Sequence, residues 1–192
     1  MRSLLLFSSC LIAVSTASAA PYIGVYGGWN KDDVIVLPFV VAQDGHVVGG
    51  VLGTNVASVP GLRFEADVSF RQNEVEIFGG LINADHDTTA LMGNVAYDIA
   101  AGLPVTPYVL AGIGWAQTRA TFEDVAILRL EASGLAWQVG GGISVEVATG
   151  VHAGIGYRYF QGPEINPLAG LGLPELSDGS NQSVVAEMRF AL

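Results

Sequence analysis

Strict alternation of apolar and polar residues over Gly61–Arg71 constrains the fold of this chain more than any other feature. The segment reads GLRFEADVSFR, with apolar residues at every second position from Leu62 to Phe70 and charges at four of the positions between and beside them. A period of two residues predicts a β-strand with one apolar and one ionic face. In a soluble sheet the ionic face would meet water. The rest of the chain favours the reverse, with the apolar face toward lipid and the charges inside a small closed barrel.

The composition is apolar without a candidate membrane helix in the body of the chain. Of the 192 residues, 51% are hydrophobic and only 14% are charged. No internal stretch approaches the roughly 20 consecutive apolar residues that a transmembrane helix needs. A transmembrane β-barrel spreads its apolar residues over alternate positions, which fits this composition. The length suits one domain.

The first 19 residues have the pattern of a secretory signal peptide. Arg2 supplies the positive charge, Leu4–Val14 form the apolar core, and Ala17-Ser18-Ala19 is a small-residue cleavage site. We therefore expect a cleaved signal over residues 1–19 and a barrel domain over residues 20–192. A membrane anchor is the alternative, but the segment is short for one and ends in Ser and Ala.

Cysteine content and charge exclude several classes of function. Cys10 is the only cysteine and lies inside the predicted signal. Lipidation there would need cleavage just before it, where Phe7-Ser8-Ser9 is a poor lipobox. The mature chain then has no disulfide, no cysteine metal ligand and no cysteine nucleophile. The net charge of −10 makes nucleic acid a poor partner.

Eight strand-like segments, most about ten residues long, match the length of a tilted strand that crosses a bilayer. They are Tyr22–Asn30, Gly45–Asn55, Gly61–Gln72, Thr88–Ile99, Pro107–Thr118, Leu135–Val147, Val151–Phe160 and Ser183–Leu192. Long connections (Lys31–Asp44, Asn73–Asp87, Arg119–Gly134, Gln161–Gln182) alternate with short ones (Val56–Pro60, Ala100–Thr106, Ala148–Gly150). The sequence thus predicts an all-β fold: an eight-stranded antiparallel transmembrane β-barrel with long outer loops and short periplasmic turns.

Aromatic residues gather near both ends of the predicted strands, where amphipathic rings prefer to lie in a membrane. Those at the outer ends are Trp29, Phe70, Trp115, Trp137 and Tyr159, and those at the periplasmic ends are Phe64, Tyr97 and Phe190.

The same alternation predicts a cluster of charges inside the barrel. Its members are Arg63, Glu65, Asp67, Arg71, Glu146, Arg158, Glu187 and Arg189. Four arginines face four carboxylates, so the interior can be neutral, as it must be if buried charges are not to destabilise it. Three interpretations stay open: a structural plug of ion pairs, a narrow polar pore or gate, and a catalytic carboxylate pair.

Other motifs give no positive sign of a catalytic, cofactor or metal site. Asp85-His86-Asp87 alternates metal-binding residue types in a predicted outer loop, but a solvated acidic loop is the favoured interpretation. Gly140-Gly141-Gly142 is not followed by a helix, so it is not expected to bind phosphate; small residues inside a narrow barrel relieve crowding. We expect no catalytic residue, no cofactor and no metal.

Six segments resemble the opacity-protein-like family of small outer-membrane β-barrels in Gram-negative bacteria. They are PYIGVYGGW (21–29), GLRFEADVSFR (61–71), MGNVAYDI (92–99), TPYVLAGIGWA (106–116), AWQVGGGISVEV (136–147) and GYRYF (156–160). The resemblance covers the mature chain. It implies a bacterial outer-membrane protein with a structural, envelope-integrity or adhesion role carried by the outer loops. The alternating apolar residues of the C-terminus resemble the signal read by the barrel-assembly machinery, although Leu192 stands where Phe is usual.

The partners implied are outer-membrane lipid and lipopolysaccharide, the assembly machinery through the C-terminal strand, and host or surface ligands at the outer loops. Three alternatives remain. They are a narrow porin-like channel for small solutes, a lipid-modifying barrel enzyme, and a soluble periplasmic barrel with an apolar ligand cavity. The inward charges of Gly61–Arg71 argue against the last.

Overall fold

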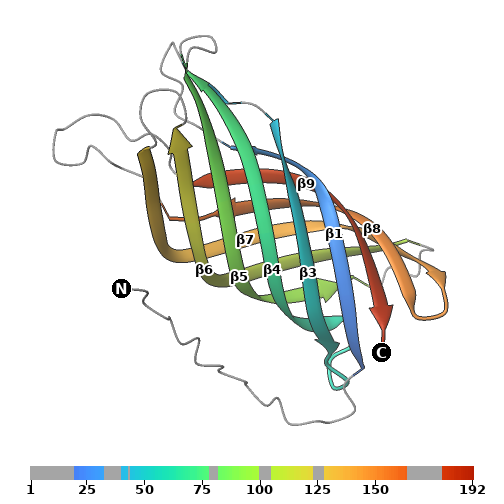
Figure 1. Cartoon of the computed structure of the whole chain (residues 1–192). Coiled ribbons are helices and arrows are strands. Elements are labelled where there is room, and N and C mark those ends of the chain that lie inside the picture. The colour runs from blue at the N-terminus through green and yellow to red at the C-terminus, as the bar shows by residue number, and fades with distance from the viewer. Residues whose placement is uncertain are drawn as a thin grey trace.

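The computed structural model describes residues 20–32, 40–42, 44–77, 82–99, 105–122, 128–163 and 179–192. The predicted signal peptide lies outside these residues. Nine strands make up one sheet (Figure 1): β1 (Pro21–Asp32), β2 (Val40–Ala42), β3 (Asp44–Asn55), β4 (Leu62–Ile77), β5 (Ile82–Asp98), β6 (Thr106–Phe122), β7 (Leu128–Ala148), β8 (Val151–Gln161) and β9 (Ser180–Ala191). The described part of the chain contains no helix long and apolar enough to span a membrane.

The sheet closes into an antiparallel barrel with eight strand positions, which we call staves; β2 and β3 share one of them. Apart from the short β2, every strand pairs with its neighbours in sequence, and β1 pairs with β9 to close the ring. The short β2 continues the line of β3 along β4, with Val40 opposite Ile77. The predicted fold class is therefore confirmed.

The strands are strongly sheared around the barrel. Starting at Leu62, the chain of directly opposed residues runs through every stave and returns to β4 at Gln72, ten residues further along. A closed sheet with such a stagger must tilt its strands relative to the barrel axis. The tilt is visible in Figure 1.

Both ends of the described chain lie at the same end of the barrel. The N–H of Leu192 donates to the carbonyl of Pro21 (3.0 Å), and the N–H of Asn55 donates to the carbonyl of Ala20 (3.2 Å). We call this the terminal end, and the opposite end, toward which β4 and β5 extend, the loop end. The predicted short turns Val56–Pro60 and Ala148–Gly150 lie at the terminal end, where Gly150 adopts a φ of 75° that favours glycine.

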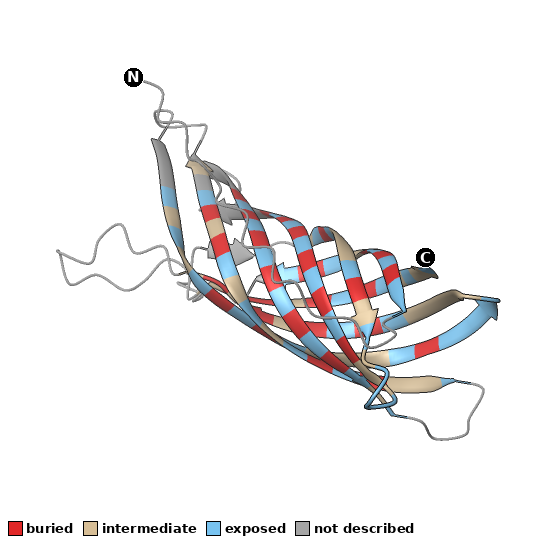
Figure 2. Cartoon of the chain, turned by 90° about the horizontal axis from the view of Figure 1, so that it is seen from below, coloured by how far each residue is buried: buried red, intermediate tan, exposed pale blue. Residues whose placement is uncertain are grey.

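The strands are polar inside and apolar outside. Along β4, Arg63, Glu65 and Asp67 are buried, whereas Phe64 and Val68 are more than 40% exposed. Figure 2 shows the resulting bands of buried and exposed residues that alternate along each strand. An outer surface covered with exposed Val, Leu, Ile and aromatic side chains is not that of a monomeric soluble protein. The orientation predicted for Gly61–Arg71 is thus confirmed.

Two of the predicted long loops are largely strand. β4 and β5 continue as a hairpin until Ile77 opposes Ile82, and β6 and β7 continue until Phe122 opposes Leu128. The prediction stopped the strands near residues 72, 88, 118 and 135 because the apolar–polar alternation fades there. Beyond the apolar band, strands can remain paired through their backbones without an apolar face.

Candidate functional site

The eight charges predicted for the interior do not all lie together. Arg63, Glu65, Asp67, Arg71 and Arg158 are buried, and Glu187 and Arg189 are partly buried in the same lumen. Glu146 is exposed. Seven of the eight thus face the interior, and they divide into groups at different depths.

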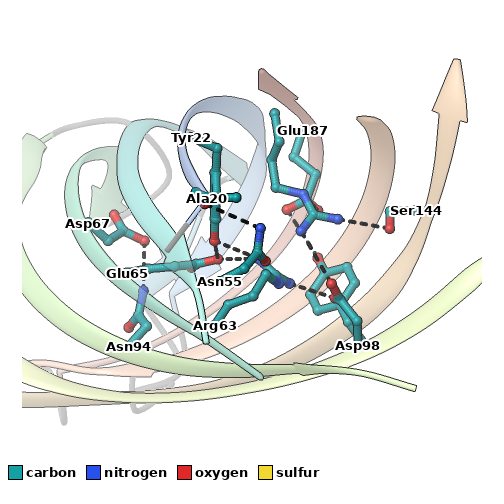
Figure 3. Close-up of polar contacts among 12 residues, drawn as sticks. Ala20, Tyr22, Asn55, Arg63, Glu65, Asp67, Asn94, Asp98, Ser144 and Glu187 are labelled. Atoms are coloured by element: carbon teal, nitrogen blue, oxygen red, sulfur yellow. Dashed lines mark hydrogen bonds and ion pairs between the residues drawn. The ribbon is translucent and has the colours of Figure 1, made fainter. Parts of the chain in front are cut away.

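The group nearest the terminal end centres on Arg63 (Figure 3). Its guanidinium contacts Glu65, donates to Asp98 Oδ1 (2.9 Å) and donates to the hydroxyl of Tyr22 (2.9 Å). The Tyr22 hydroxyl in turn donates to Glu65 Oε1 (2.6 Å). Two carboxylates and one phenol therefore surround one buried cation.

A second group lies deeper in the barrel around Asp67, whose side chain has no exposed surface. Arg158 donates to Asp67 Oδ2 (2.8 Å), Tyr26 donates to Oδ1 (2.8 Å), and the amide of Asn94 donates to Oδ2 (3.3 Å). Gln138 extends the chain of hydrogen bonds by donating to Asn94 Oδ1 (2.7 Å). Hydrogen bonds to charged groups in such an enclosed site are the strong ones.

Two residues of the last strand join these groups. Glu187 lies 3.7 Å from Arg158 and accepts from the Tyr108 hydroxyl (3.1 Å). Arg189 donates to Ser144 Oγ (2.9 Å) and lies 3.7 Å from Asp98. The lumen network, defined as the groups connected from Arg63 to Gln138, therefore spans every stave of the barrel except the one formed by β2 and β3.

Among the described residues, the charges of the interior balance. The lumen network holds Arg63, Arg158 and Arg189 against Glu65, Asp67, Asp98 and Glu187. The fourth cation, Arg71, lies further toward the loop end, where its guanidinium stacks on the Phe160 ring (3.9 Å to the centroid) and donates to Ser69 (2.8 Å). Pairing of this kind is what allows charges to be buried without prohibitive loss of stability.

Glu146 was wrongly assigned to the interior, and Asp98 takes its place. The pairing of β7 with β8 is regular up to Glu146–His152 and shifts register just beyond it, so Glu146 lies at the end of the strand, where the residues on both sides of it are also exposed. Its carboxylate accepts from the N–H of Gly150 at the adjacent turn (3.1 Å). Asp98 could have been found, because it shares the inward parity of Asn94 and Ala96 on β5.

The inward tyrosines Tyr22, Tyr26 and Tyr108 were also missed. Each lies over glycine on a neighbouring strand: a Cβ on Gly53 would lie 2.2 Å from the Tyr22 ring, and one on Gly49 would lie 2.3 Å from the Tyr26 ring. The available signal was the phase of β1, in which Tyr22 and Tyr26 alternate with Ile23 and Val25. The glycines predicted to relieve crowding do so; a Cβ on Gly156 would lie 2.3 Å from the Tyr108 hydroxyl.

An apolar layer separates the lumen network from the loop-end half of the lumen. Its buried members are Ala90, Met92, Ala116, Ala136 and Phe160. The interior is therefore a packed core of mixed polarity, as expected for a barrel of eight strands, whose lumen is just wide enough for side chains to fill.

The Asp85-His86-Asp87 motif does not bring its side chains together at one site. His86 is buried while Asp87 is exposed on the other face of β5, and within the described residues no group of three or more His, Cys, Asp and Glu could hold a metal ion. Of the other histidines, His46 is exposed and His152 is partly buried.

Comparison with known proteins agrees with this architecture. The sequence model of the family described as "Outer membrane protein beta-barrel domain" matches residues 3–178. The chain belongs to this family. Family membership and the closed barrel indicate the bacterial outer membrane as its location, while cleavage of residues 1–19 stays a prediction. The resemblance to small opacity-like barrels is confirmed at the level of the fold.

Two solved structures are close in fold to this outer-membrane β-barrel. Neisserial surface protein A has a TM-score of 0.67 at 17% identity, with 91% of this chain and 99% of that one covered. A major outer membrane protein from Thermus thermophilus has a TM-score of 0.65 at 9% identity, with 91% and 100% covered. No curated protein sequence matches the chain. At these identities the likeness concerns the fold.

The outer surface of this outer-membrane β-barrel carries aromatic side chains toward both of its ends. Trp29, Phe70, Trp115 and Trp137 are exposed toward the loop end, and Phe64 and Tyr97 are exposed toward the terminal end. Trp137 also packs against Tyr159, with ring centroids 5.5 Å apart. Such girdles mark the two interfaces of a bilayer.

Proposed function

We propose that this chain is a surface protein of the bacterial outer membrane with a structural or interaction role. In this proposal the barrel is a closed, rigid scaffold and the loop end is the working surface. The observation that carries the proposal is the buried ion-pair network, in which Arg158 and Asp67 have side-chain exposures of 3% and 0%.

A network of this kind argues against conduction. An ion crossing the lumen would have to separate Arg158 from Asp67 and displace the apolar layer around Phe160. Removal of one partner from a buried pair costs roughly 3–5 kcal/mol of stability, so separation of the pair is also expected to be unfavourable. The porin-like alternative is therefore the less favoured one.

The loop end offers the larger surface for partners. The β4–β5 hairpin reaches Ile77 and Ile82, well past the exposed Phe70, so it stands above the apolar band. We propose that host or other surface ligands are bound there and that the barrel itself performs no catalysis.

Single-channel recording tests the scaffold proposal. The protein, purified from outer membranes and shown to be folded by its heat-modifiable gel mobility, is inserted into a planar bilayer beside a large porin as a positive control. We expect a folded and electrically silent protein. Reproducible conductance steps would replace this proposal with the small-solute channel.

Shortening of one hairpin tests the interaction proposal. Residues 74–85 are replaced by Asn-Gly, so that Asn73 and His86 are joined by a two-residue turn. The residue pairs up to Asn73–His86 remain, so we expect normal assembly together with reduced attachment of expressing cells to immobilised host matrix proteins. Unchanged attachment after shortening this hairpin and also the β6–β7 hairpin, with residues 120–130 replaced by Asn-Gly so that the Arg119–Glu131 pair remains, would contradict the interaction role.

A further inference from the structure

A surface pocket lies on the outside of the barrel near the loop end, between β1, β8 and β9. It has a volume of about 240 Å³, and its outward lining includes Trp29, Lys31, Tyr157, Gln182 and Val184. The register explains the gathering, because Val184 lies directly opposite both Trp29 and Tyr157, and Lys31 lies opposite Gln182. Three strands thus bring two aromatic rings, one cation and one amide to one place on the wall.

The walls of the pocket are chemically distinct. The indole of Trp29 is 76% exposed, the highest value among the exposed large hydrophobic side chains. The Tyr157 hydroxyl donates to Gln182 Oε1 (2.8 Å), which fixes these two side chains relative to each other. Toward the terminal end the wall continues with exposed Val25, Val184 and Ile155. The pocket is therefore polar on its loop-end side and apolar below.

Lys31 is an unusual cation in this acidic chain. Among the outward side chains that the structure describes, Lys31 and Arg119 are the two cations, and Arg119 pairs with Glu131 at 3.1 Å. Within the same described residues, Lys31 has no carboxylate within ion-pair distance. In the pairing of β1 with β3 the residue directly opposite Lys31 is Asp44, so an anion from outside the chain must compete with this acidic residue for the Lys31 charge.

The depth of the pocket in the membrane indicates the class of that anion. Trp29 belongs to the loop-end girdle, which marks the bilayer interface. Lys31 follows two residues later on the same face, so its ammonium lies on the headgroup side of the ring. Anions at that depth are the phosphates of lipid headgroups. A sugar ring attached to the phosphate can lie against the exposed indole face, and acyl chains can follow the apolar wall below.

We propose that Trp29, Lys31, Tyr157 and Gln182 form a binding site for the phosphorylated headgroup of an outer-leaflet glycolipid of the lipid A class. Lys31 pairs with a phosphate, the indole of Trp29 covers the sugar, and Tyr157 with Gln182 holds the sugar hydroxyls. The site depends on the membrane location of the barrel and is independent of the role proposed for the loop end.

Native mass spectrometry of the protein, extracted from outer membranes and stripped of lipid in detergent, tests the site. The probes are bisphosphorylated lipid A and its monophosphorylated form. We expect wild type to bind the bisphosphorylated form about fivefold more tightly, the effect of one exposed charge pair. Lys31→Gln should abolish this preference and Lys31→Arg should keep it. Trp29→Ala should weaken binding of both forms.

Arg119→Gln is the matched control, because it removes the other outward cation without touching the pocket. It should leave the preference unchanged, and all variants should keep wild-type heat-modifiable mobility. Two results would overturn the site: retention of the preference by Lys31→Gln, or equal loss of it in Arg119→Gln. The second result would mean that net charge, and not this pocket, attracts the lipid.

Discussion

The guanidinium of Arg158 lies 3.9 Å from the centroid of the Tyr26 ring, and both side chains bind the carboxylate of Asp67. The anion is thus shared between a cation and a phenol that also contact each other. In an enclosed site such mutual contacts couple the three groups, so the removal of one affects the other two.

Removal of the Asp67 charge should therefore destabilise the barrel strongly. Asp67→Asn leaves Glu187, at 3.7 Å, as the carboxylate that still pairs with Arg158, and we expect a loss of about 3–5 kcal/mol in unfolding free energy. Urea titration of the protein folded in lipid vesicles measures it. The double variant Asp67→Asn with Arg158→Gln should lose less than the sum of the two single variants. Strict additivity would show that the groups are not coupled.

Charge placed on the lipid-facing side of β4 should impair insertion. Val68 is 41% exposed on the outer face, and Val68→Lys should reduce stability by about 2–4 kcal/mol if the residue lies near the bilayer midplane. Gln72→Lys is the control, because Gln72 is exposed on the same face four residues closer to the loop end. Comparable amounts of folded protein in outer membranes for wild type and Val68→Lys would refute the facing of this strand.

A methyl group on Gly53, which is not itself part of the lumen network, should disrupt the network through Tyr22. The added Cβ would lie 2.2 Å from the Tyr22 ring, so the ring must move and its hydrogen bond with Glu65 must change. We expect a loss of about 1–3 kcal/mol, typical of overpacking. Gly27→Ala is the matched control, since its nearest contact would be 3.6 Å away. Equal midpoints of heat-induced unfolding for both variants would argue against the crowded interior.

Asp98 and Glu146 should behave differently although both lie near the terminal end. Asp98 binds Arg63 and faces Arg189, so Asp98→Asn should destabilise the barrel by about 1–3 kcal/mol. Exposed Glu146 should tolerate Glu146→Gln within about 0.5 kcal/mol. Urea midpoints of the two variants, measured side by side, decide the assignment. A larger loss for Glu146→Gln than for Asp98→Asn would show that Glu146 belongs to the interior charges, as the sequence predicted.

The fold was predictable because the period of two is strong wherever one face meets lipid. In β4 the contrast between Val68 and Asp67 is unmistakable, and the register follows once one face is fixed. The strand ends were not predictable, because beyond the apolar band the strands keep their pairing without an apolar face. The sequence did not predict β2 for the same reason, since its residues show no apolar–polar alternation.

Only charged residues could be assigned to the lumen from the sequence, because a charge on a membrane-spanning strand indicates a polar surrounding. Tyrosine suits both a membrane interface and a packed lumen, so Tyr22 and Tyr26 had to be placed by the phase of β1. Glu146 was misassigned because parity does not show where along a strand the lumen ends, and Glu146 lies beside the turn at the end of β7. Ion pairing between distant strands, such as Arg158 with Asp67, depends on the shear of the closed barrel.

The closure between β1 and β9 also completes contacts of the interior charges. Arg158 of β8 lies over the ring of Tyr26 of β1, and Arg189 of β9 lies over the ring of Tyr22 of β1, and both contacts cross this seam. A sheet left open at this seam would leave both cations without these rings, and charges without partners are costly away from water. The interior charges thus favour the closed ring over any open form of the same sheet.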